Sequence, residues 1–216
     1  MVHAGAVPRN RARDRLSMKI NSRLQKDRAE VRKLTRHMAI TIAPLEADLN
    51  FAANQWAKDT QSQFWRRTVI RCHLAVAEAL LWNMKHIAAK IACISGLQLT
   101  QDELEVAHEE RVVMVNGKPE RRPKFLKFRD NLKASFSLFS KVHGVRAAER
   151  SGPGFDAFCE TYELRSRLMH PKGPFDPNVS DDDIATAQRG GDWFGREYRQ
   201  LMQRCEEAAP KIARGK

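Results

Sequence analysis

The chain has 216 residues and a mass of 24.7 kDa, which allows one sizeable domain with an appendage and is short for two full domains. Apolar residues make up 42% and charged residues 30%, a composition that excludes an intrinsically disordered chain. The formal net charge of +12 and a pI near 9.9 predict an acidic partner, either nucleic-acid phosphates or anionic lipid.

The cysteines and the apolar segments bear on location. The four cysteines form no CxxC pair, which excludes a zinc knuckle and a thioredoxin-type motif and favours the reduced cytoplasm. They are Cys72, Cys93, Cys159 and Cys205. The N-terminus has no apolar stretch after its positive charges, so no secretory signal is expected. The most apolar window, residues 74–94, contains Glu78, Lys85, His86 and Lys90, too many charges for a membrane span.

The N-terminal segment is strongly basic. Residues 1–40 hold eleven Lys and Arg against three Asp and Glu, which is +8 of the total +12. From about Arg11 to His37 a thin apolar stripe predicts a helix. This basic N-terminal helix, the arm of residues 1–43, is interpreted either as an RNA-binding arm or as a solvated helix packed on the body by its stripe. The expected RNA-binding residues are Arg11, Arg13, Arg15, Lys19 and Arg23.

Two helices are expected next. Pro44 suits the first turn of a helix that continues to about Ser62. Apolar residues recur every three or four positions from Phe64 to Ile94, which predicts a central helix ended by Ser95 and Gly96. Its one polar line is expected to face solvent or, alternatively, to form the rim of a functional cleft. That line consists of Arg71, Glu78 and Lys85.

The segment 111–128 predicts a small β-hairpin inserted between helices. A β-prone run of valines precedes Asn116-Gly117, a strong hairpin signal. The second β-prone run, Phe125–Phe128, begins only after Pro123. A loop longer than two residues is therefore expected.

Three further helices complete the chain. One contains Phe136 and is stopped by Gly144, and the next must end at His170 because Pro171 disfavours helical geometry in the residue before it. Ser180 and Asp183 resemble a capping box at the start of the last helix. In that helix Gly190-Gly191 predicts either a close approach of another helix or a break in two.

The helix before Pro171 carries unusual polar residues. At 100° per residue, Phe155, Phe158, Tyr162 and Met169 define its buried face. Three polar residues fall on or beside this face: Arg165, Ser166 and His170. An inward cation and imidazole near a helix end need a partner or a shared cleft, because burying an unpaired charge is costly.

The run from Glu163 to Pro171 resembles the arginine-x4-histidine motif of the HEPN superfamily, with Arg165 and His170 at the matching positions. Residues 44–216 are accordingly identified as a HEPN-like helical domain. The expected fold class is all-α: a HEPN-like helical bundle with the inserted hairpin and the basic N-terminal helix. Where active members commonly carry an amide or an acid after the arginine, this chain has Ser166, which reaches less far.

The resemblance implies RNA and a second copy of the chain as partners, and an antitoxin as a further candidate partner. It implies a metal-independent endoribonuclease of toxin or phage-defence type that needs no cofactor. His170 would move a proton and Arg165 would hold the scissile phosphate. The alternative is a non-catalytic module that dimerises and binds RNA or protein. In that case Arg165 pairs with Glu160 or Glu78, and His170 caps its helix.

Other candidate sites are weaker. His73 and His86 lie thirteen residues apart without a third ligand at helical spacing, so no metal site is expected. Trp82, Trp193 and Phe194 are expected in the core, with base stacking as the alternative. No Walker-type loop, GxSxG elbow or HExxH pair is present, which argues against the NTPases, hydrolases and zinc proteases that use them.

Overall fold

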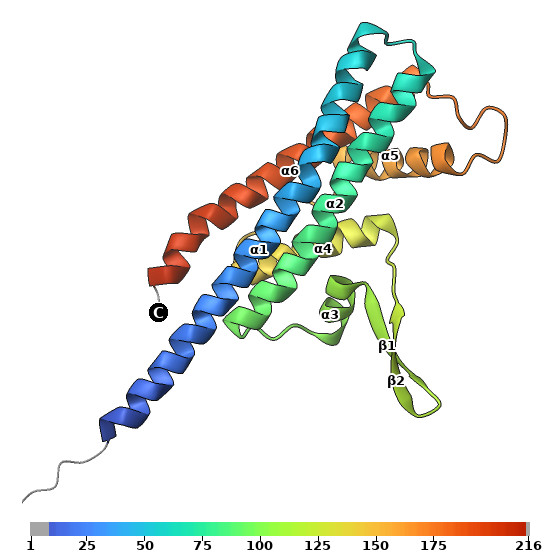
Figure 1. The fold of residues 1–216 in the computed structure, drawn as a ribbon. Helices are drawn as coiled ribbons and strands as arrows, with labels where there is room; N and C mark the ends of the chain where they lie inside the picture. The colour runs from blue at the N-terminus through green and yellow to red at the C-terminus, as the bar shows by residue number, and fades with distance from the viewer. Residues whose placement is uncertain (1–8, 215–216) are drawn as a thin grey trace, which may run out of the picture.

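The computed structural model describes the backbone of residues 9–214 and the side chains of residues 22, 25, 26 and 28–208. These residues form six helices and one hairpin, so the expected all-α fold with a small inserted hairpin is confirmed (Figure 1). The elements are α1 (Arg9–Lys58), α2 (Gln63–Ser95), α3 (Gln101–His108), β1 (Glu110–Val115), β2 (Lys118–Pro123), α4 (Phe128–His143), α5 (Pro153–Met169) and α6 (Asp181–Arg214).

Helices α1 and α2 run antiparallel and form a long helical hairpin (Figure 1). The expected helix start at Pro44 is wrong, because α1 continues through this residue. A proline in a helix leaves the carbonyl four residues earlier without its usual donor. Here that carbonyl belongs to Ile40, whose side chain is 66% exposed, so water can reach this side of the helix. Ile42, on the other side, is buried in the core and holds the helix in place.

The N-terminal part of α1 extends beyond the end of the other helices (Figure 1). The helix has 50 residues and is therefore about 75 Å long. Lys90 of α2 pairs with Glu30 at 2.6 Å, and Leu34 and Met38 pack against the core. The five arginines and lysines expected to bind RNA lie in the first fifteen residues of this helix. Their side chains, like those of Leu16, Ile20 and Leu24, lie outside the described part of the chain.

The core lies between α2 and the helices α4, α5 and α6. Leu74, Ala77, Leu81 and Met84 of α2 are each no more than 1% exposed. They belong to one apolar cluster with aromatic residues of the three other helices, namely Phe136, Phe155, Phe158, Trp193 and Phe194. The expectation that Trp193 and Phe194 belong to the core is confirmed. Trp82, by contrast, is 42% exposed, so its expected burial is wrong.

Helix α6 is continuous through its glycines. A β-carbon on Gly190 would lie 2.7 Å from the backbone of Phe158, and one on Gly191 would overlap the ring of His73. Of the two alternatives for this glycine pair, the close approach of neighbouring helices is the one observed. The capping box at the start of α6 is also observed, with Ser180 and Asp183 each accepting from the other's backbone N–H.

The inserted hairpin turns at Asn116 and Gly117, which have φ angles of 50° and 75°. Positive φ at both residues is typical of a two-residue type I′ turn. The returning strand is therefore β2, paired with β1 from Val115↔Lys118 to Glu110↔Pro123. The expected longer loop and the strand Phe125–Phe128 are wrong, because the tight turn fixes the register before the second apolar run begins. Helix α3, which has a capping box of Thr100 and Glu103, was not predicted.

No helix among residues 9–214 combines the length and the apolar content that a membrane span requires.

Candidate functional site

The candidate motif lies at the C-terminal end of α5. The helix ends at Met169, as Pro171 predicts, and the backbone N–H of His170 donates to the carbonyl of Ser166 at 3.0 Å. The side chain of His170 is exposed and that of Met169 is 46% exposed. The expectation that these two residues face the interior is therefore wrong. The reason is that the buried face changes along α5: Phe155 and Phe158 enter the core at its start, whereas Leu164 and Leu168 are the buried residues near its end.

Arg165 lies one turn and a half before His170 and pairs with α2. Its Nη2 lies 3.3 Å from Oε2 of Glu78, and the two side chains are 28% and 37% exposed. Glu78 is one of the two acids expected as a partner; the other, Glu160, is exposed. The guanidinium is thus held at the surface of the α2–α5 contact, where solvent still reaches it. Ser166, which follows Arg165 directly in the sequence, is half-buried.

The polar line of α2 faces other elements of the fold. Arg71 donates to the carbonyl of Leu168 in α5 at 2.9 Å, and Glu78 holds Arg165. The expectation that this line faces solvent holds for Arg71, which is exposed, and is wrong for Lys85, which is only 1% exposed. Glu78 is half-buried and lines a pocket of about 340 Å³.

Lys85 is the most deeply placed cation of the described residues. Its Nζ lies 2.5 Å from Oε1 of Glu109 and 2.7 Å from Oδ1 of Asn131. Ser135 donates to the backbone carbonyl of Asn131 at 2.7 Å. Burying a cation is tolerated only with a charged partner and further hydrogen bonds, and both are present here. This network fixes the end of α3, and with it the hairpin, against α2 and α4.

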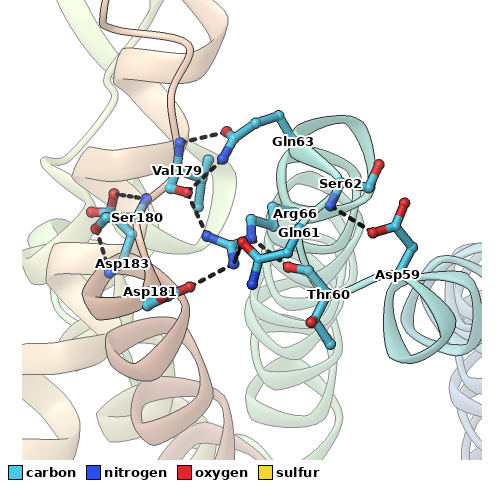
Figure 2. A network of polar contacts seen from close by, with 10 residues as sticks. All are labelled: Asp59, Thr60, Gln61, Ser62, Gln63, Arg66, Val179, Ser180, Asp181 and Asp183. Carbon is cyan, nitrogen blue, oxygen red and sulfur yellow. Dashed lines mark hydrogen bonds and ion pairs between the residues drawn. The ribbon is translucent and has the colours of Figure 1, made fainter.

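The segment that follows His170 is fixed by a second network (Figure 2). Arg66, at the start of α2 and 5% exposed, donates to the carbonyls of Thr60 and Val179 at 2.6 and 2.9 Å. It also pairs with Asp181 at 2.5 Å. Gln63 bonds both the N–H and the carbonyl of Val179. The start of α6 is thereby tied to the turn between α1 and α2. The sequence offered one signal for this role, an arginine in the first turn of an otherwise apolar helix.

A larger pocket, of about 1160 Å³, lies beside this second network. Glu160, Glu163 and Arg167 of α5 line it, together with Asp181 and Asp183 of α6. Arg167 pairs with Asp183 at 3.2 Å. Neither Arg165, Ser166 nor His170 is part of its wall, so the motif and this pocket lie on different sides of α5.

The two histidines of α2 each lie against an aromatic ring. Burial lowers the pKa of His73, an effect that Asp192 partly opposes, and His73 packs against the ring of Phe158. His86 stacks on Trp82 at 3.8 Å and bonds its carbonyl. Within the part of the chain whose side chains are described, no three His, Cys, Asp or Glu residues gather as ligands for a metal ion.

Comparison of the chain with protein-family models, with curated proteins and with solved structures finds no match. The resemblance to the HEPN superfamily therefore stays a prediction, based on Arg165, His170 and the sequence around them.

Proposed function

We propose that this chain is a HEPN-like RNA-binding protein that cleaves RNA without a metal ion. The observation that carries the proposal is the placement of Arg165 and His170. Both lie at the end of α5, both are reached by solvent, and the imidazole of His170 is exposed. An accessible imidazole and a guanidinium near the same helix end supply the two kinds of group that transesterification at a ribose phosphate uses.

In the proposed reaction, one imidazole takes the proton of a ribose 2′-hydroxyl, and the O2′ oxygen attacks the adjacent phosphorus. The bond from phosphorus to the O5′ oxygen breaks, and a second imidazole gives a proton to that oxygen. The products are a 2′,3′-cyclic phosphate and a 5′-hydroxyl. A homodimer that brings two copies of His170 together would supply both imidazoles, as the family resemblance implies. Arg165 would hold the phosphate while negative charge develops, with the Ser166 hydroxyl as an additional donor.

The basic arm supports the RNA part of the proposal. Residues 1–40 carry +8 of the total charge of +12, and α1, which begins at Arg9, extends beyond the other helices (Figure 1). A projecting cationic helix attracts phosphates without base specificity, and such binding weakens steeply with salt. A toxin or phage-defence role, with an antitoxin as a further partner, would fit a ribonuclease of this kind.

A non-catalytic module that binds RNA and dimerises is the second candidate, and the Arg165–Glu78 ion pair favours it. A guanidinium that already has a carboxylate partner holds α5 to α2. In the catalytic proposal, phosphate must compete with Glu78 for Arg165. The replacement Glu78→Gln should then raise cleavage or RNA affinity, whereas a purely structural pair predicts only a loss of stability.

The deciding experiment is a cleavage assay on a mixed RNA in EDTA, with analysis of the product ends. The wild-type chain is compared with His170→Ala and with His108→Ala, a matched loss of an exposed histidine outside the motif. We expect cyclic-phosphate ends that disappear only in His170→Ala. Cleavage that persists in the His170→Ala protein would refute the role of this residue. RNA binding without cleavage by any of the folded proteins would select the second candidate.

A further inference from the structure

The pocket beside Glu78 is built from five parts of the chain. Its wall combines α2, the end of α3, the link from the hairpin to α4, the start of α4, and α5. Its volume of about 340 Å³ falls at the lower end of the range of small-molecule sites. A pocket of this size suits a single planar ring system and the atoms bonded to it.

Aromatic side chains form much of this wall. Trp82 is 42% exposed, and one face of its ring is covered by His86. Phe125 is 77% exposed and packs against no other aromatic ring among the described residues. Phe128 and Tyr162 stack on each other at 3.9 Å and close another side. Exposed aromatic rings around a cavity are typical of binding sites, and every nucleobase has a face that can stack on them.

Two carboxylates also line the pocket, and each already has a cationic partner. Glu78 pairs with Arg165, and Glu109 pairs with the buried Lys85. Because these charges cancel, the pocket does not attract a cation by net charge. The carboxylate oxygens remain strong hydrogen-bond acceptors.

Asn131 adds a donor. Its Oδ1 accepts from Lys85 at 2.7 Å. Because the oxygen is used in this bond, the Nδ2 group of the amide remains as the donor. The pocket therefore offers carboxylate acceptors together with one amide donor. Guanine presents the complementary edge, with N1–H and N2–H₂ as donors and O6 as acceptor. Adenine, with an acceptor at N1 in place of the N–H, fits this pattern less well.

We propose that this pocket binds a guanine base of single-stranded RNA, stacked against Trp82 and Phe125 with its donor edge toward Glu78 and Glu109. The inference deepens the proposed function and rests on it, because Glu78 is also the partner of Arg165. A base seated against Glu78 brings its own ribose and phosphate toward this arginine. The pocket thus gives the cleavage reaction a preference for guanine next to the scissile phosphate.

The test uses free mononucleotides, so that it does not depend on cleavage. Tryptophan fluorescence of the full chain is titrated with GMP, IMP, AMP, CMP and UMP, since a stacked base quenches Trp82. We expect saturable quenching by GMP, at least tenfold weaker binding of AMP, CMP and UMP, and weakened binding of IMP, which lacks the 2-amino group. Replacement of Trp82 by Leu should remove the signal.

A matched pair of variants ties the binding to the pocket. Phe125 and Phe175 are both 77% exposed, and only Phe125 lines this pocket. Phe125→Ala should weaken GMP binding at least tenfold, whereas Phe175→Ala should leave it unchanged. Glu78→Gln should reduce the preference for GMP over AMP.

Three results would overturn the proposal: no quenching by any nucleotide at millimolar concentration, equal binding of all five, or binding of spermidine in preference to GMP, which would make this a cation site. Failure of the proposed function looks different. GMP binding without RNA cleavage would retain the pocket and reject the ribonuclease, whereas cleavage without GMP binding would reject the pocket alone.

Discussion

Gly190 of α6 lies against the backbone of Phe158 in α5, so closely that a β-carbon on the glycine would be 2.7 Å from the amide nitrogen of the phenylalanine. The contact lets the two helices approach until the ring of Phe158 stacks on Phe194 at 4.7 Å. It also fixes the position of α5, which carries Arg165 and His170 at its other end.

Replacement of Gly190 by alanine should therefore destabilise the fold by about 2 kcal/mol, as expected for overpacking against backbone that cannot move aside. Gly195, in the same helix, is the matched control. Its β-carbon would meet only the flexible end of Arg199 at 3.4 Å. Gly195→Ala should be neutral or stabilise the helix by about 0.5 kcal/mol. Chemical denaturation measures both, and equal effects of the two variants would argue against the close contact.

Arg66 should control the order of the segment that follows the motif. Its guanidinium satisfies the carbonyls of Thr60 and Val179 and pairs with Asp181 (Figure 2). Arg66→Gln should cost about 2 kcal/mol, because the buried guanidinium's bonds to two carbonyls and its ion pair with Asp181 are lost together. Hydrogen exchange should become faster in residues 171–180. Arg67→Gln removes a single bond, to the carbonyl of Pro177, and should have less than half of this effect. If exchange in this segment is unchanged in Arg66→Gln, the network does not hold it.

His73 should make stability depend on pH. Burial lowers its pKa from the ordinary value of 6.5. In the folded chain the imidazole stays neutral at a pH where the unfolded chain binds a proton. The free energy of unfolding should therefore be highest above pH 6.5 and fall as the pH is lowered below this value.

The comparison is between the wild-type chain and His73→Gln. Between pH 7.5 and 5.5 the loss of unfolding free energy should be smaller in the variant, because the variant has no imidazole to titrate in the unfolded state. Chemical denaturation at several pH values measures this difference, and NMR titration gives the pKa of His73 directly. A His73 pKa at or above 6.5 would contradict the prediction.

The cysteines should differ in reactivity. Burial raises the pKa of Cys205 to about 11 and also raises the pKa of Cys159, whereas Cys93 is exposed. The thiolate is the reactive form, so iodoacetamide at pH 8 should modify Cys93 more than tenfold faster than Cys205. Mass spectrometry of the peptides gives the two rates. In urea the rates should converge, and a native Cys205 that reacts as fast as Cys93 would exclude its burial.

The sequence by itself determined the helical elements whose signals are local. Periodic apolar residues located the central helix, Gly96 and Gly144 ended their helices with positive φ, and Pro171 ended α5. Asn116-Gly117 located the hairpin, and the +8 of residues 1–40 located the basic arm. These signals act over a few residues through backbone geometry, hydrogen bonding and charge, so no tertiary information is needed to recognise them.

Only the tertiary structure decided which way the polar residues face. A helical wheel places Lys85 on the same line as Arg71. In the fold the end of α3 covers Lys85, whereas Arg71 stays exposed. The same wheel turns His170 inward, although the last turn of α5 buries Leu168 and leaves His170 exposed. The pocket beside Glu78 combines residues from α2 and α5 with the link after an inserted hairpin. Such a wall depends on the packing of segments distant in the sequence, which a local pattern does not encode.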